Sequence, residues 1–108
     1  MNDSITIRRI RESELITPLL SQLSKSPHGF AKTSDLIDYL SNLFQPSGED
    51  ASILNGRNDT KFSQKVRNLV SHRNDRNGIQ TRGLVRYIRE ENGLQITKKG
   101  QRYLKTIH

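Results

Sequence analysis

Apolar residues recur at helical spacing in four segments of the chain. They follow the i, i+3, i+4, i+7 pattern that places side chains on one face of a helix. The pattern is strongest over residues 33–44 and is also present over residues 13–24, 60–74 and 98–107. The apolar positions are Leu15, Ile16, Leu19, Leu20 and Leu23; Leu36, Ile37, Leu40, Leu43 and Phe44; Phe62, Val66, Leu69 and Val70; and Tyr103, Leu104 and Ile107. This spacing predicts four amphipathic helices.

Polar side chains indicate where these helices begin, because a side-chain oxygen can accept a hydrogen bond from a free N–H of the first turn. The predicted caps are Ser13, then Thr33 or Ser34, then Asp59 or Thr60, and finally Thr97. Pro18 has no N–H, so the first helix either starts near Thr17 or begins earlier and kinks. Gly100 lies inside the last helix at a cost of about 1 kcal/mol relative to alanine, which close packing there would explain.

The segment 84–97 has the pattern of a β-hairpin. Two β-prone runs flank Asn92-Gly93, a pair that favours a two-residue type I′ turn. Such a turn would place Val85, Tyr87, Leu94 and Ile96 on one face of the hairpin and Arg86 on the other. It predicts the cross-strand pairs Glu91–Leu94, Arg89–Ile96 and Ile88–Thr97.

These elements predict one domain over residues 13–108, preceded by a flexible arm over residues 1–12 that could also contain a short edge strand. The predicted fold class is mainly α with a small β-hairpin. Residues 30–32 could be extended, residues 49–58 read as a polar link with a possible turn of helix at 50–54, and residues 75–83 read as a flexible basic segment. A chain of 108 residues is long enough for one modest core.

Positive charge is concentrated in the second half of the chain. Residues 1–56 contain 5 Lys or Arg and 7 Asp or Glu, a net charge of −2, whereas residues 57–108 contain 13 and 4, a net charge of +9. A cationic half releases counterions from a polyphosphate, so nucleic acid is the leading class of partner, which the helix over residues 60–74 narrows to double-stranded DNA. An anionic membrane is a weaker candidate, because its surface helices pair a basic face with exposed large apolar residues. The alternative is a basic protein kept soluble by its charge. No apolar run approaches the roughly 18 residues of a membrane span, and the apolar stripes are needed for the core, so no membrane partner is expected.

The helix predicted over residues 60–74 has a polar face that suits DNA. At about 100° per residue, its far side carries amide, guanidinium and hydroxyl groups, which bond to base edges and phosphates. The predicted contacts on this face are Gln64, Arg67, Asn68 and Ser71, flanked by Lys61, Lys65 and His72. The predicted phosphate contacts are Lys65, Arg57, Arg73 and Arg76. A surface helix of any basic protein could look the same.

The chain contains no group of residues that suggests catalysis. His28, His72 and His108 lie far apart without metal-ligand spacing, and cysteine is absent. Ser71 and His72 are neighbours on a helix, so their side chains diverge. We therefore expect neither an enzyme nor a metal or other cofactor. The absence of cysteine suits a cytoplasmic protein.

Several residues together resemble the winged helix-turn-helix, the DNA-binding fold with a three-helix core, a two-stranded wing and a C-terminal helix. They are Gly83-Leu84-Val85, Tyr87, Ile96-Thr97, Gly100 and Tyr103-Leu104. The run FSQKVRNLVSHR followed by GLVRY is similar to winged-helix domains fused to restriction endonucleases. These include the Mrr-type N-terminal domain and adenine-methylation reader domains. The resemblance implies a bacterial-type cytoplasmic protein that associates with the nucleoid.

The resemblance also implies how DNA would be bound. The helix over residues 60–74 would enter the major groove, and the N-terminus of the helix after Thr33 and Ser34 would approach a phosphate. The wing would span residues 86–95, and Glu90 and Glu91 at its tip depart from the usual pattern because phosphate repels them. The backbone contact would then fall to Arg82, Arg86 and Arg89.

The resemblance implies the targeting module of a restriction or defence system, working with a nuclease domain or subunit and able to sense adenine-methylated DNA. Two alternatives share the same fold. One is a transcriptional regulator, and the other is a protein-interaction module with an acidic partner. A dimerising regulator usually has a long extra helix for self-association, so a monomeric module is expected.

Overall fold

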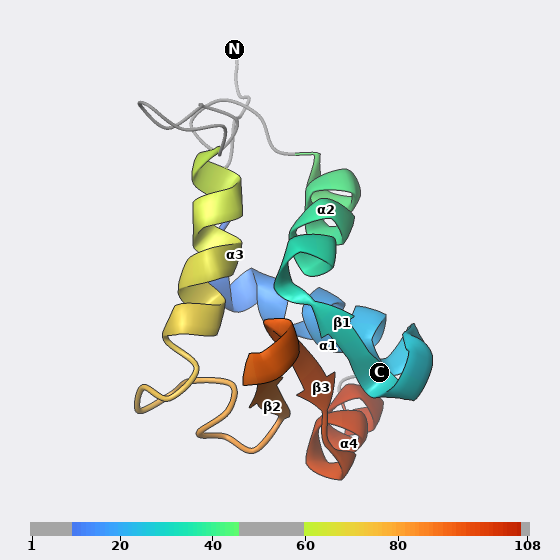
Figure 1. The fold of residues 1–108 in the computed structure, drawn as a ribbon. Coiled ribbons are helices and arrows are strands. Elements are labelled where there is room, and N and C mark those ends of the chain that lie inside the picture. The colour runs from blue at the N-terminus through green and yellow to red at the C-terminus, as the bar shows by residue number, and fades with distance from the viewer. Residues whose placement is uncertain (1–9, 46–59, 107–108) are drawn as a thin grey trace.

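The computed structural model describes residues 10–45 and 60–106. It is mainly helical with a small antiparallel sheet, which confirms the predicted fold class at this level (Figure 1). Predictions for the arm over residues 1–9, the turn at 50–54, Arg57, Asp59 and Ile107 lie outside the described residues. The elements are η1 (Glu12–Leu15), α1 (Ile16–Lys25), η2 (Pro27–Gly29), β1 (Phe30–Lys32), α2 (Thr33–Phe44), α3 (Lys61–Ser71), β2 (Val85–Ile88), η4 (Arg89–Glu91), β3 (Gly93–Ile96) and α4 (Lys98–Thr106).

The sheet has three strands in the order β1-β3-β2, with both neighbouring pairs antiparallel. The predicted two-stranded hairpin is therefore extended by β1, the short segment that the sequence marked as potentially extended. Tyr87 pairs with Leu94 and Val85 pairs with Ile96, so the predicted shared face is confirmed. Leu94 and Val85 are almost completely buried on this face, and Arg86 is exposed on the other.

The predicted hairpin register is wrong by four residues. Leu94 pairs with Tyr87 and not with Glu91, because the turn is the longer segment formed by η4 and Asn92. Gly93 belongs to β3, where a Cβ would lie 2.5 Å from both the Ala31 carbonyl oxygen and the Phe30 ring. This glycine therefore permits close approach of β1 and does not form the tip of the turn.

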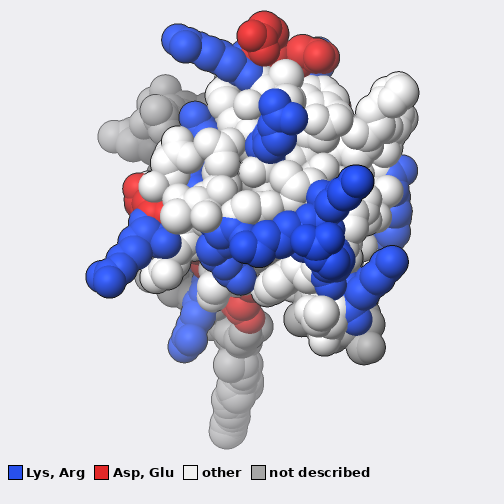
Figure 2. Space-filling model, turned by 90° about the horizontal axis from the view of Figure 1, so that it is seen from below, with Lys and Arg blue, Asp and Glu red and all other residues white. Residues whose placement is uncertain are grey.

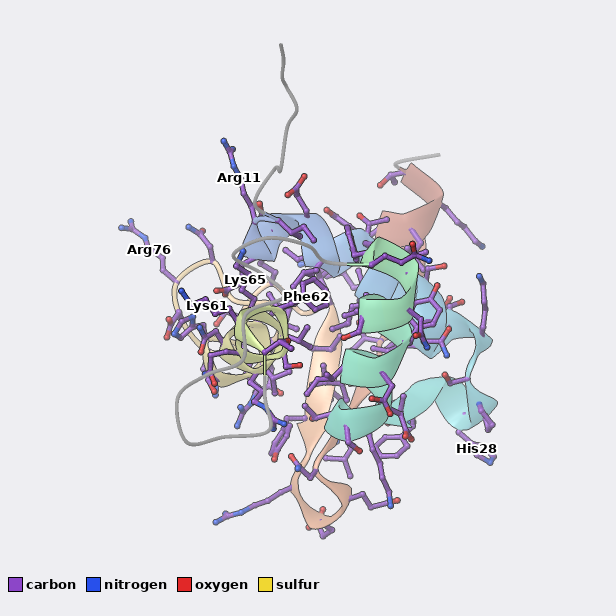
Figure 3. All side chains as sticks on the ribbon, turned by 90° about the horizontal axis from the view of Figure 1, so that it is seen from above. Arg11, His28, Lys61, Phe62, Lys65 and Arg76 are labelled. Atoms are coloured by element: carbon purple, nitrogen blue, oxygen red, sulfur yellow. The ribbon has the colours of Figure 1, made fainter. Side chains whose placement is uncertain are left out.

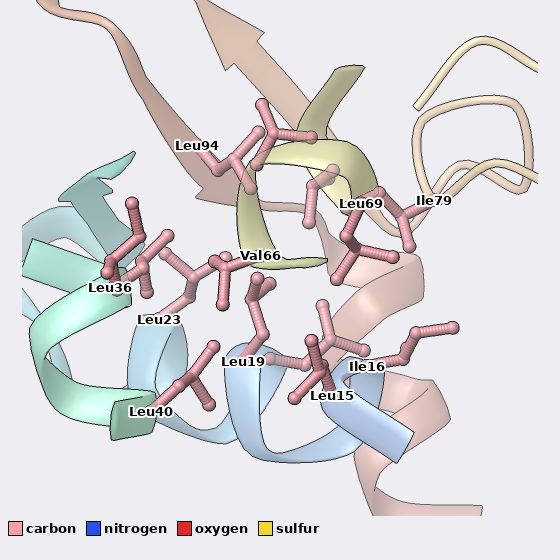
Figure 4. Close-up of a cluster of buried hydrophobic side chains, with 14 of the residues drawn as sticks. Leu15, Ile16, Leu19, Leu23, Leu36, Leu40, Val66, Leu69, Ile79 and Leu94 are labelled. Carbon is pink, nitrogen blue, oxygen red and sulfur yellow. The ribbon is translucent and has the colours of Figure 1, made fainter. Parts of the chain in front are cut away.

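One hydrophobic core joins α1, α2 and α3 to the inner face of the sheet (Figure 4). The buried positions reproduce the predicted apolar stripes, and α1 carries Pro18 in its first turn, where proline is tolerated. Leu43 is the exception among the predicted positions, because 52% of it is exposed. Ile10, which lies within the predicted arm, is only 8% exposed and belongs to the core. The packed part of the chain thus begins before Ser13.

Two of the predicted helix caps are confirmed. Thr60 Oγ1 accepts a hydrogen bond from Ser63 N at 3.0 Å, and Thr97 Oγ1 accepts one from Gly100 N at 2.9 Å. The Thr33 or Ser34 cap is wrong, because Lys32 is the N-cap of α2 and makes no side-chain cap bond. Thr33 is instead 6% exposed, and its N–H donates to the Asn92 carbonyl of the hairpin at 2.9 Å.

The segment 72–84 is packed against the body and is not the predicted flexible loop. Ile79 is fully buried, which anchors the middle of the segment in the core. The Arg73 carbonyl accepts the N–H groups of Gln80 and Thr81, each at 3.0 Å. A Cβ at Gly78 would lie 2.2 Å from this same carbonyl oxygen, so the turn requires glycine here. A single isoleucine among polar residues was too weak a pattern to reveal this anchor.

Candidate nucleic-acid interface

The polar face of α3 is formed as the sequence predicted. Phe62 and Val66 are fully buried, while Arg67 and Ser71 are exposed on the opposite side of the helix. Gln64 and Asn68, one turn apart, are partly buried and joined by a 2.9 Å hydrogen bond from Gln64 Nε2 to Asn68 Oδ1. No Asp or Glu occurs between Lys61 and Ser71. The helix thus presents amide, guanidinium and hydroxyl groups together.

The cations beside this face lie on one side of the molecule, and Lys65 among them also contacts another part of the fold (Figure 3). Lys61, Lys65, Arg76 and Arg11 lie on the same side of the molecule, whereas Phe62 points inward (Figure 3). Lys65 Nζ donates to the Ile10 carbonyl at 2.5 Å, so the ammonium group holds the chain that enters η1.

His72, at the end of α3, also contacts the segment that precedes α1. Its Nδ1 lies 3.4 Å from Glu12 Oε1, and 54% of its side chain is exposed. The predicted contacts Lys65 and His72 therefore both touch the N-terminal segment, and Lys61 is partly buried beside them. The helical angles alone gave no sign of this neighbour, because Ile10 and Glu12 are more than 50 residues away along the chain.

Arg73 holds the fold together in a way that the sequence did not reveal. Its Nη1 donates to the Val70 carbonyl at 2.9 Å, and its guanidinium carbon lies 4.0 Å from the centroid of the Tyr87 ring. Its Nε is buried. These contacts give Arg73 a structural role, and its predicted phosphate contact stays a prediction.

The remaining predicted contacts are spread over other elements. Arg86 in β2 and Arg89 in η4 are exposed, while Arg82 is partly buried with its guanidinium carbon 5.4 Å from the Tyr103 ring centroid. Of the two residues at the N-terminus of α2, Ser34 is exposed and Thr33 is buried. The Thr33 side chain is therefore not available to a phosphate.

A hollow of about 400 Å³ opens beside the C-terminal end of α3, between η1 and the turn over residues 75–78. Glu12, His72, Asp75 and Arg76 contribute its polar lining, and Ile16 is among its apolar residues. Within residues 10–45 and 60–106, no group of three or more His, Cys, Asp or Glu side chains could hold a metal ion.

Comparisons with models of protein families, with curated protein sequences and with solved structures found no significant match to this chain. The fold and the surface define a mainly helical domain with a three-stranded antiparallel sheet, in which α3 is cationic and contains no carboxylate. No helix in the described part of the chain has both the length and the apolar character to cross a membrane.

Proposed function

We propose that this chain is a double-stranded DNA-binding module of the winged-helix type, in which α3 enters the major groove and the β2–β3 hairpin is the wing. The order of elements supports this proposal. A helix, a short strand and two more helices precede a hairpin, and β1 completes the sheet beside β3. The resemblance of the hairpin and α4 sequences to winged-helix proteins points the same way.

The outward face of α3 is the observation that carries the proposal. The amides of Gln64 and Asn68 can each pair bidentately with the donor and acceptor of adenine, and Arg67 can pair bidentately with guanine. Each such pair contributes roughly 1–3 kcal/mol of discrimination against a wrong base. The mutual hydrogen bond of Gln64 and Asn68 orients both amides before binding, which lowers the entropic cost of recognition.

Flanking cations would provide the sequence-independent part of the affinity. The side chains best suited to phosphate are Lys61 beside the face, Arg76 in the segment over residues 72–84 (the turn segment), and Arg86 and Arg89 on the hairpin. Arg76, Arg86 and Arg89 are exposed. Glu90 and Glu91 would keep the tip of the wing away from the backbone, so the arginines on either side of it would make the contact.

The resemblance to domains fused to restriction endonucleases extends the proposal to a targeting role in a restriction or defence system, with a nuclease domain or subunit as partner. Any reading of adenine methylation would then occur in the groove. All six aromatic residues lie in the described ranges and each is buried or partly buried. Phe62 is fully buried and Arg73 stacks on Tyr87, so neither ring offers a pocket for an extruded base.

The test is a binding titration with labelled duplexes of identical sequence, unmodified or adenine-methylated. The double variant Arg67→Ala/Asn68→Ala should bind both at least tenfold more weakly than the wild type, because two base-edge contacts are lost. The control Lys25→Ala/Asn42→Ala removes one cation and one amide from exposed positions on α1 and α2. It should retain most of the affinity.

Each outcome has a distinct meaning. Selective binding of methylated duplex, lost in the α3 variant, would establish a modification reader. Equal binding of both duplexes, weakened by the α3 variant, would fit a regulator or a general targeting module. No binding by the wild type at about 50 mM salt would refute the proposal and favour an acidic protein partner, since electrostatic affinity for DNA is strongest at low salt.

A further inference from the structure

A second group of cations gathers where α4 meets the segment before β2. We call Arg82, Lys99 and Arg102 the α4 cluster. Arg82 stacks over the Tyr103 ring at 5.4 Å. Lys99 crosses Gly83 so closely that a Cβ there would lie 3.2 Å from Lys99 Cδ and 3.7 Å from Nζ. The Arg82 guanidinium is thus held by a ring contact and the Lys99 side chain passes beside Gly83, so both cations start from the same part of the surface.

Arg102 completes the cluster on the same side of α4. It is exposed, and it follows Lys99 by three residues, a spacing that places both side chains on one side of a helix. The opposite side of α4 faces α1, where Ser24 Oγ donates to Gln101 Oε1 at 3.0 Å. The cluster therefore points away from the contact that α4 makes with the body.

The elements around the cluster provide no carboxylate to balance its charge. Residues 76–89 and 92–106, which contain the cluster, have no Asp or Glu, and they include β2, β3 and α4. Seen from below the view of Figure 1, Lys and Arg side chains run across this face, with acidic side chains mainly toward its edges (Figure 2). A patch of one sign on this scale creates a potential that attracts polyanions.

The cluster lies on a different side of the molecule from the groove face of α3. In the views of Figures 1 and 3, α3 and α4 lie on opposite sides of the body. α3 packs against α2 and η1, whereas α4 packs against α1 and β3. A straight duplex that follows α3 on its side of the body would therefore face away from α4.

From this arrangement we infer that the α4 cluster is a second nucleic-acid surface, which binds the phosphodiester backbone without reading sequence. The inference rests on the proposed function and extends it. The phosphates come either from a distant part of the same duplex, bent around the domain, or from a second duplex. An anionic membrane is disfavoured, because such surfaces pair cations with exposed large apolar side chains. Among the described residues, the exposed large apolar side chain is Leu43 on α2.

The test uses Lys99→Gln/Arg102→Gln, which removes two charges while leaving Arg82 on Tyr103. The matched control, Lys25→Gln/Lys32→Gln, removes two exposed charges from α1 and β1. Thermal unfolding should show that both variants are folded. Binding of a duplex of about 40 base pairs, several helical turns long, is measured across a fourfold range of salt. In parallel, donor- and acceptor-labelled duplexes of about 12 base pairs, one turn each, are mixed with protein to detect bridging by energy transfer.

If the bound phosphates belong to the same duplex, the affinity for the long duplex will change in Lys99→Gln/Arg102→Gln, the cluster variant. The slope of log K against log salt should fall by about 1.8 in the cluster variant, so the wild type should lose about 12-fold more affinity over the fourfold salt range. If they belong to a second duplex, the wild type should give energy transfer between the short duplexes, and the cluster variant should lose it. The control variant should behave as the wild type in both arms.

A cluster variant that matches the control in both arms overturns the inference. Loss of binding in Arg67→Ala/Asn68→Ala alongside that result would leave the groove-reading function intact. If the cluster variant loses duplex binding and Arg67→Ala/Asn68→Ala does not, α3 is rejected as the reading helix and the cluster remains a nucleic-acid surface. Absence of wild-type binding to both duplexes at about 50 mM salt would reject both proposals.

Discussion

Substitution of Arg73 tests whether a cation predicted to touch phosphate instead stabilises the fold. The guanidinium group joins the end of α3 to β2, since Nη1 donates to the Val70 carbonyl at 2.9 Å and the group stacks 4.0 Å above the Tyr87 ring. The Arg73 carbonyl also accepts two N–H groups from the turn segment. Arg73→Ala removes the side-chain contacts and keeps the backbone ones.

The expected loss of unfolding free energy follows from the two side-chain contacts. A hydrogen bond from a charged donor contributes about 1.5–3 kcal/mol. A cation over an aromatic ring contributes about 0.5–1 kcal/mol when exposed and about 2 kcal/mol when desolvated. Restored freedom of the arginine-sized side chain offsets up to about 2 kcal/mol of the total. The net loss should be about 2 kcal/mol, which for a domain of this size lowers the Tm by roughly 10 °C.

The assay compares Arg73→Ala, Arg73→Lys and Arg76→Ala by denaturant unfolding. Arg76 is exposed in the same turn segment, so its removal should change the free energy of unfolding by less than about 0.5 kcal/mol. Lysine retains the charge but lacks the planar group that stacks and donates together, so Arg73→Lys should recover only part of the loss. DNA affinity, measured well below the unfolding transition, should fall no further in Arg73→Ala than in Arg76→Ala.

If Arg73 instead bound a DNA phosphate, the variants would show the opposite results. Arg73→Ala would then be as stable as Arg76→Ala, its affinity for DNA would drop, and Arg73→Lys would restore the affinity because lysine also neutralises phosphate. That set of results would refute the structural role of Arg73 and return it to the predicted contact surface.

Two further substitutions test the packing and capping of the helices. Gly100→Ala should lower the free energy of unfolding by about 1–2 kcal/mol, because overpacking against the Leu84 carbonyl, 2.3 Å from the new Cβ, outweighs the gain in helix propensity. Calorimetry with Lys98→Ala as the surface control checks this, and a raised Tm for Gly100→Ala would contradict it. Thr60→Ala should cost about 1 kcal/mol, because Ser63 N loses its cap, and Thr60→Asp should restore most of it in the same measurement.

Most of the fold could be predicted from the sequence, because each helix buries a stripe whose period is visible in one segment. The hairpin shows the limit of this reasoning. Asn92-Gly93 matched a turn signal, yet Gly93 was required by β1, which approaches it from more than 60 residues away in the chain. The shared face of Tyr87 and Leu94 was still predicted correctly, because a shift of four residues preserves the alternation of sides.

The candidate site could likewise be predicted only in part. The angles of a helix determined that Gln64 and Arg67 would lie opposite Phe62, and they do. The same angles could not reveal what stands beside the helix. Lys65 Nζ donates to the Ile10 carbonyl and the Arg73 guanidinium group stacks on the Tyr87 ring, and the helical angles contain neither contact. Only the tertiary contacts separate cations that hold the fold from cations that face solvent.

The acidic hairpin turn contacts the N-terminal end of α2. The Asn92 carbonyl accepts the N–H of Thr33, the first residue of α2, so the turn that carries Glu90 and Glu91 sits at the N-terminal end of that helix. Negative charge near a helix N-terminus is stabilising by about 0.3–1 kcal/mol. The Asn92 carbonyl thereby accepts one N–H at the end of α2 for which the winged-helix resemblance implied a phosphate contact. On the proposed function, contacts of the wing with the DNA backbone would then fall to Arg86 and Arg89, which are exposed beside the turn.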